Sequence, residues 1–135
     1  MGVWPVPQDL YRLNASYVQT EFRAVYEQHL YPRMHEHQRA IVVPAAYAAM
    51  GDDPSVNWSI PQYDATMQAI AWAAYNWTVS DPRVAGIAPW HWYDDGRPGP
   101  YSYGVASLPR TRAAYTAISS LLNRGAKNST RKNVN

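Results

Sequence analysis

The chain has 135 residues, of which 47% are hydrophobic and 16% are charged, and this balance is typical of one globular domain rather than of a disordered or fibrous segment. It contains no cysteine, which excludes a disulfide framework and any thiolate metal site. The formal net charge of +2 depends partly on a basic cluster in the last dozen residues, so we predict no nucleic-acid partner. The lack of a run of about 18 apolar residues predicts no membrane span.

The first predicted element is an amphipathic helix from Ala15 to about Leu30. Its apolar residues recur at spacings of three and four, and Pro32 is expected to stop it. A short run rich in β-branched residues, 38–44, follows. Such a run predicts a strand that is buried on both faces.

A second helix is predicted from Ser59 toward Val79. Ser59 is a good N-cap residue, and Pro61 suits the first helical turn. The Asp81-Pro82 pair is expected to end this helix, because the residue before a proline avoids helical backbone angles. The loop between the first strand and this helix is rich in turn-forming residues.

A second apolar strand is predicted from Arg83 to about Trp92. Gly86 and Ala88 are small for sheet residues, which suggests that another part of the molecule packs closely against them. A loop rich in glycine, proline and tyrosine follows this strand. These features predict a close-packed strand that ends in a cluster of aromatic residues.

A third helix is predicted to begin near Pro109 and to end near Asn123 or Gly125. The remaining residues, 126–135, are polar and basic, and we interpret them as a disordered polar tail. The chain is therefore divided into residues 1–125, which form the folded part, and this tail.

The alternation of helices with fully buried strands predicts an α/β fold with parallel strands and right-handed crossovers. Two strands alone make a marginal sheet, and each predicted strand needs neighbours on both edges. We therefore predict a partial (β/α)8 (TIM) barrel, with two parallel strands and three helices that correspond to its last units. Such a chain is expected to associate with itself through its open sheet edges.

A resemblance supports the same architecture. Residues 30–44 and 81–92, the second ending in Pro89-Trp90-His91-Trp92, resemble the seventh and eighth strand regions of a TIM-barrel glycoside-hydrolase-like protein, and the likeness covers about residues 10 to 123. It implies that an aromatic residue at the end of the last strand forms the floor of the sugar subsite. Trp90 and Trp92 match that position.

The chemistry of sugars also favours these tryptophans as binding residues. A pyranose ring presents a face of C–H bonds that stacks on a flat indole, and its hydroxyls need polar neighbours. Trp90 and Trp92 share strand parity with Val84, so we expect both to point into the barrel mouth. Tyr47 and Asp94 are the further candidates for contact with a sugar. The alternative is that both indoles fill the core under the helices.

Catalytic acids are not evident. The resemblance implies a glutamate at the end of the seventh strand and another at the end of the fourth, but the seventh-strand position here reads Pro44-Ala45-Ala46-Tyr47 and the fourth strand lies outside the chain. The catalytic residues are therefore unknown. We interpret the chain as a fragment of a carbohydrate-active hydrolase that supplies the sugar-binding rim, or as a non-catalytic carbohydrate-binding or structural relative. A third interpretation is a small α/β interaction module.

No cofactor or metal is predicted. The cluster of His29, His35, Glu36 and His37 does not match a metal-binding spacing, and we interpret it as a solvated turn. Four N-x-Ser/Thr sequons begin at Asn14, Asn57, Asn76 and Asn128. This excess favours a secretory parent protein, with coincidence as the alternative, and leaves the compartment of the chain unknown.

Overall fold

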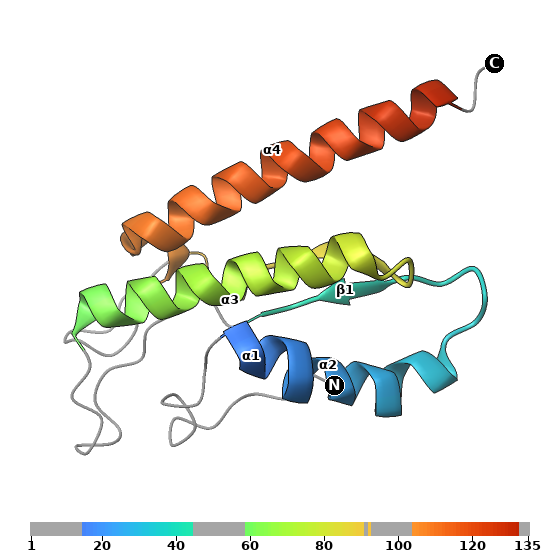
Figure 1. Cartoon of the computed structure of the whole chain (residues 1–135), viewed down its shortest axis with the longest axis horizontal. Helices are drawn as coiled ribbons and strands as arrows, with labels where there is room; N and C mark the ends of the chain where they lie inside the picture. Colours follow the sequence, from blue (N-terminus) through green and yellow to red (C-terminus); the bar gives the residue numbers. More distant parts are fainter. Residues whose placement is uncertain (1–14, 45–58, 91, 93–103, 133–135) are drawn as a thin grey trace.

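The computed structural model describes residues 15–44, 59–90, 92 and 104–132, with side chains described as far as Gly125. The fold is α/β and mostly helical. Helical segments pack against a sheet of two parallel strands (Figure 1). The α/β class with parallel strands is therefore confirmed.

The first helical segment is continuous from Ala15 to Arg33, although its hydrogen-bonding pattern changes along its length. It comprises α1 (Ala15–Tyr17), the π-helical turn η2 (Val18–Phe22), α2 (Arg23–Val25), the π-helical turn η3 (Tyr26–Leu30) and the 3-10 turn η4 (Tyr31–Arg33). The chain becomes extended at Met34, where φ is −82° and ψ is 138°. The predicted helix is confirmed, and Pro32 lies in its last turn.

The two strands are β1 (Ala40–Val42) and β2 (Val84–Ile87), and they pair in parallel. Hydrogen bonds extend the pairing beyond both strands: the Ala88 N–H donates to the Val42 carbonyl at 2.9 Å, and the Trp90 N–H donates to the Pro44 carbonyl at 3.2 Å. The crossover between the strands is α3 (Ile60–Ser80). A parallel pair needs such a crossover, so this part of the prediction is confirmed.

Helix α3 begins and ends where the sequence predicted. The Ser59 N–H donates to Oε1 of Gln62 at 2.7 Å, which is the reciprocal bond of a capping box. At the other end Ser80 is the last helical residue and Asp81 is extended. The cap and the Asp-Pro pair therefore fix the length of the crossover.

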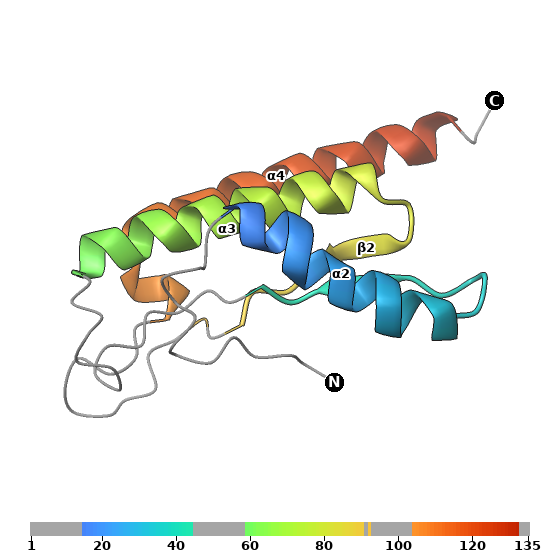
Figure 2. The same cartoon turned by 60° about the horizontal axis from the view of Figure 1, so that its bottom comes forward.

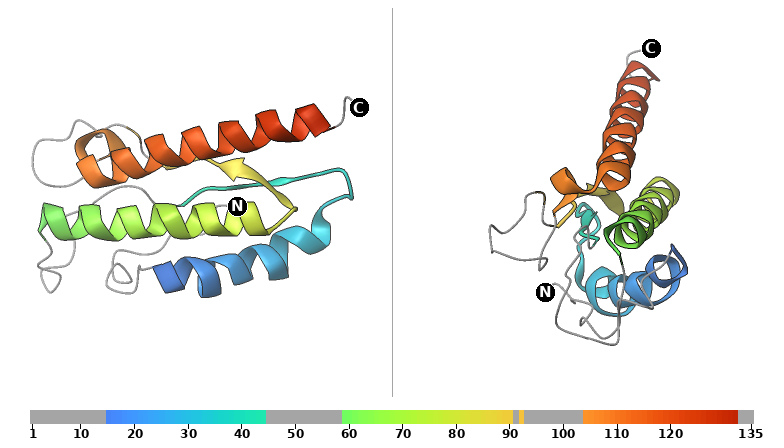
Figure 3. Two further views of the ribbon diagram at one scale, coloured as in Figure 1. Left: turned by 45° about the horizontal axis from the view of Figure 1, so that its top comes forward. Right: turned by 90° about the vertical axis from the view of Figure 1, so that its left-hand side faces the viewer.

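Helix α3 is the centre of the core. The three helical segments lie around one side of the strands, as the end-on view of Figure 3 shows. Buried residues of the larger core cluster come from the first helical segment, both strands, α3 and the turn before α4: Val18, Val42, Tyr63, Met67, Ile70, Ala73, Ala74, Trp77, Val84 and Leu108. On the other face of β1, Ile41 and Val43 are exposed. The sheet thus buries one face, as each unit of a barrel does on its helical side.

A register shift in β2 separates Val84 from the later residues with which the sequence analysis aligned it, while the direction of the two tryptophans stays a prediction. Ala40 pairs with Val84 but Ile41 pairs with Gly86, so Ala85 is an extra residue. Val84 is buried against the helices, whereas Gly86 lies opposite the exposed Ile41. A count of alternate residues from Val84 therefore does not give the direction of residues after the shift.

The close packing expected at Gly86 is also absent among the described residues. A Cβ atom at this position would meet only Cδ1 of Ile41, at 3.8 Å, which is an ordinary van der Waals contact. The small residues of this strand therefore face a surface that the described residues do not fill.

The 3-10 turn η5 (Val105–Ser107) leads into α4 (Pro109–Lys132), which packs along α3 (Figure 2). A second cluster of buried residues fills their interface: Ala71, Val105, Ala114, Tyr115 and Ile118. The predicted end of this helix near Asn123 or Gly125 is wrong, since the helical backbone continues to Lys132. The division of the chain at residue 125 stays a prediction. None of the helices in the described ranges has the length and apolar character that a membrane crossing requires.

Candidate functional site

Trp90 and Trp92 lie just beyond the carboxyl end of β2. The two residues are 44% and 40% exposed, so neither fills the core under the helices. The backbone on either side is held in place: the Trp90 N–H donates to the Pro44 carbonyl, and the Trp92 carbonyl accepts from the Ala106 N–H at 2.9 Å. Two exposed aromatic rings are therefore presented by anchored backbone at this end of the sheet.

Trp92 lines a groove of about 540 Å³ between the end of β2 and one face of α4. The strand side contributes Ile87, Pro89 and Trp92, and α4 contributes Tyr115, Thr116, Ile118, Ser119, Ser120, Leu122 and Asn123. The volume falls in the range of ligand pockets, about 300 to 1,000 Å³. Trp90 is not among the lining residues, so the two tryptophans differ in their surroundings.

The groove carries polar groups with unused hydrogen-bonding capacity. Tyr115 is only 6% exposed, and its hydroxyl is buried without a hydrogen-bond partner among the described residues. Burial also raises the pKa of this phenol well above its usual range, so the hydroxyl remains a donor at neutral pH. Thr116 and Ser120 donate to carbonyls of their own helix, at 2.9 and 3.1 Å, and their oxygens can still accept.

The other predicted sugar contacts, Tyr47 and Asp94, lie outside the described residues. The Pro44 carbonyl, where the resemblance implies a nearby carboxylate, pairs with the backbone of Trp90. No Asp or Glu of the described ranges lines the groove. The structure therefore brings together Trp92 and the polar face of α4, a combination that sequence reasoning missed.

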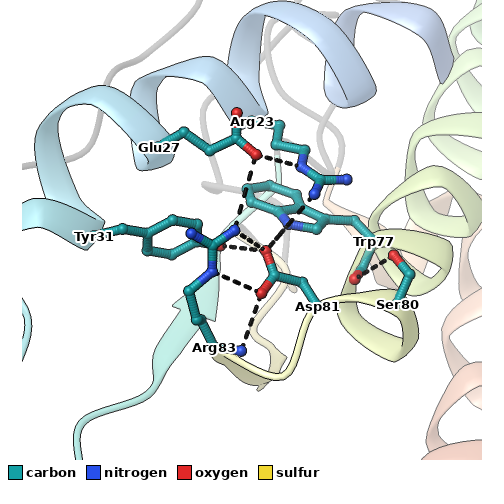
Figure 4. A network of polar contacts seen from close by, with 7 residues as sticks. All are labelled: Arg23, Glu27, Tyr31, Trp77, Ser80, Asp81 and Arg83. Atoms are coloured by element: carbon teal, nitrogen blue, oxygen red, sulfur yellow. Dashed lines mark hydrogen bonds and ion pairs between the residues drawn. The ribbon is translucent and has the colours of Figure 1, made fainter. Parts of the chain in front are cut away.

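A saturated polar network occupies the opposite end of the sheet, where β2 begins (Figure 4). Asp81 is 3% exposed, and its carboxylate accepts three bonds from Arg83: from the backbone N–H at 3.0 Å, from Nε at 2.9 Å and from Nη2 at 2.9 Å. Tyr31 Oη and Trp77 Nε1 also donate to it, at 3.2 and 3.4 Å. These contacts join the first helical segment, the end of α3 and β2.

Charge and ring contacts complete this network. The Arg83 guanidinium lies 3.9 Å from the centre of the Tyr31 ring, a cation–π arrangement. Hydrogen bonds from Arg83 hold the pKa of Asp81 well below its usual range, and burial together with the Asp81 charge raises the pKa of Tyr31 to about 12. Because the acid is ionised and its carboxylate accepts five hydrogen bonds from three other residues, we interpret the network as a structural clamp.

A second buried carboxylate connects α3 with α4. Asp64 accepts from the backbone N–H groups of Arg110 and Thr111, at 2.9 and 2.8 Å, and from the Thr111 hydroxyl at 2.8 Å. It thereby satisfies free donors in the first turn of α4, where negative charge is favoured. The cap fixes the start of the helix that forms one wall of the groove. Sequence gives no signal for this contact, because Asp64 and Thr111 are 47 positions apart.

The histidine cluster shows no metal-binding geometry. His35 and His37 stack at a centroid distance of 6.0 Å and are exposed. Across the described ranges, no three His, Asp or Glu side chains are grouped so that they could hold a metal ion.

Comparisons with family models, curated proteins and solved structures found no match to this chain.

Proposed function

We propose that this chain binds carbohydrate through Trp90 and Trp92, as the sugar-binding rim of a barrel of the glycoside-hydrolase type. The observation that carries the proposal is the exposure of both indoles at the carboxyl end of parallel strands. Ligands of parallel α/β folds bind at that end. An exposed indole on anchored backbone suits the apolar face of a pyranose ring.

The two-strand, three-helix unit supports the barrel part of the proposal. Helical segments cover one face of the sheet, and the crossover between parallel strands is a single helix, as in each unit of a barrel. The exposed Ile41 and Val43 would then face the barrel interior. In this arrangement the remaining strands come from a parent protein or from associated copies of the chain.

Binding rather than hydrolysis is the activity proposed for these residues. The two buried carboxylates of the described residues, Asp64 and Asp81, each accept several hydrogen bonds that fix helices and strands. Most glycoside hydrolases use two carboxyl groups, one on each side of the scissile bond. If the parent protein is a glycoside hydrolase, this chain would supply contacts to the sugar, and the catalytic acids would lie elsewhere.

The test is a titration of the chain with soluble hexasaccharides of cellulose, xylan, mannan, laminarin and chitin, followed by Trp fluorescence. Trp90→Ala and Trp92→Ala should each weaken binding by on the order of 1 to 3 kcal/mol, the scale of a buried aromatic contact.

The matched control is Trp72→Ala on α3, which removes a half-buried tryptophan that packs against Tyr75 and the cluster between α3 and α4 but does not line the groove. It should leave sugar binding unchanged in folded protein. A thermal melt of each variant separates lost binding from lost folding. If no hexasaccharide binds to the folded chain, or if both rim variants bind as the parent does, the carbohydrate function is wrong.

A further inference from the structure

We propose that the groove between β2 and α4 holds a second segment of the sugar chain, so that an oligosaccharide runs from Trp92 along the polar face of α4. This inference rests on the proposed carbohydrate function and extends it to a surface on the outer side of β2. It assigns a binding role to Tyr115, Ser119 and Asn123.

The lining of the groove fits a polyhydroxylated ligand. One wall is the half-exposed Trp92 with the apolar Ile87, against which the C–H face of a sugar ring can pack. The facing wall is a helix surface with regularly spaced hydroxyl and amide groups: Thr116, Ser119, Ser120 and Asn123. A site with an apolar floor and a few convergent polar groups is typical of small-molecule binding.

Three of these polar groups have no partner within the described part of the chain. Ser119 and Asn123 make no side-chain hydrogen bond there, and both are exposed. The Tyr115 hydroxyl is more unusual because it is buried as well as unpartnered. Because this hydroxyl has almost no exposed area, a ligand must first displace the atoms that cover it, and a bond to the ligand would then offset a desolvation cost that the folded protein already bears.

Two residues that line the groove, Ile87 and Pro89, lie at the end of β2, and the side of β2 away from β1 is a sheet edge with which another strand could pair. The Ala88 and Trp90 N–H groups donate to β1 and its extension, so the backbone groups of the alternate residues, Ile87 and Pro89, face outward. Pro89 has no N–H to donate to an added strand, and proline protects sheet edges in this way. A strand paired along β2 therefore cannot continue its ladder at Pro89, whereas a sugar bound there needs no such ladder of donors.

The closing experiment measures hexasaccharide affinity and thermal stability in four groove variants and two controls. Asn123→Ala and Tyr115→Phe should each weaken binding about fivefold, the effect of one hydrogen bond. Ser119→Leu places a bulky side chain in the groove and should weaken binding more than about tenfold, as one fully lost contact would. The double variant Tyr115→Phe/Asn123→Ala should be weaker than either single variant.

The controls place the same changes outside the groove. Asn76→Ala lies on an exposed position of α3, and Ala117→Leu lies on an exposed position of α4 that does not line the groove. Both should bind as the parent does. Tyr115→Phe has a second readout: without sugar it should melt no lower than the parent, because the hydroxyl it removes has no partner.

The possible failures are distinguishable. If Trp90→Ala and Trp92→Ala weaken binding while the groove variants do not, the groove assignment is overturned and the rim function stands. If no sugar binds to the folded chain, both are overturned. If sedimentation shows an oligomer that Ser119→Leu dissociates while sugar binding is unchanged, the groove belongs to a second copy of the chain, and the inference is also wrong.

Discussion

At the amino end of β2, the buried Asp81 carboxylate receives donors from three other residues, and Arg83 stacks on the ring of Tyr31. At the carboxyl end, the Tyr115 hydroxyl lies buried without a partner among the described residues, and two indoles are more than a third exposed. One end of the sheet thus carries a dense polar network, and the other carries an unpaired buried hydroxyl and two partly exposed aromatic residues.

The largest expected effect is on the free energy of unfolding, and it is tested by replacing one tryptophan at each end of the sheet. Trp77 is 2% exposed and has edge-to-face contacts with Phe22 and Tyr26, so Trp77→Ala should lower the free energy of unfolding by about 3 to 5 kcal/mol. Trp92→Ala removes an exposed ring and should change it by no more than about 0.5 kcal/mol. Urea unfolding followed by circular dichroism measures both. Similar effects from the two variants would show that the ends do not differ in packing.

The positions of most helices and strands could be predicted from the sequence, because their signals are local. The Ser59 cap, the Asp81-Pro82 pair and the β-branched run of the first strand depend on residues a few positions apart, and these predictions of helix and strand positions are confirmed. The exposure of Trp90 and Trp92 also agrees with their predicted place at the end of a strand.

The remainder depends on contacts between distant residues. The shift at Ala85 changes the face of each later strand residue, and alternation in the sequence does not reveal an inserted residue. The bond between Asp64 and the start of α4 joins positions 47 residues apart. The groove likewise forms only when α4 lies beside the end of β2. Tertiary packing decides these features, so they are found in the structure and not in the sequence.

A smaller effect is expected when the carboxylate of the polar network is neutralised. Asp81→Asn keeps the shape of the side chain but loses its charge-assisted bonds, so it should destabilise the protein by about 2 to 3 kcal/mol at pH 7. Glu21→Gln, which removes an exposed carboxylate outside the network, is the control and should have little effect.

The pH dependence of the Asp81→Asn effect follows from the direction of the pKa shift. Asp81 has a lowered pKa in the folded protein, so its contribution is complete above the unfolded value of about 4 and is lost as the pH falls below it. The difference between parent and Asp81→Asn should therefore narrow on acidification. Urea titrations at pH 7, 4 and 3 measure it, and a constant difference would show that the carboxylate is not held ionised by its partners.

The smallest effect concerns the hydroxyl of Tyr31, which donates to Asp81 while its ring stacks against Arg83. Tyr31→Phe removes the hydrogen bond but keeps the ring, so at pH 7 it should cost about 1 kcal/mol. The folded pKa of Tyr31 is raised from 10.0 to about 12, so the stabilisation is complete below pH 10 and is lost as the pH rises through this interval. The difference between parent and Tyr31→Phe should then shrink between pH 10 and 12. Tyr75→Phe, which removes a phenol outside the network, is the matched control for both measurements. If the two phenylalanine variants were equally stable at pH 7, the Tyr31 hydroxyl would contribute nothing to the clamp, and the polar network would depend on the other partners of Asp81, which include Arg83, Trp77 and Arg23.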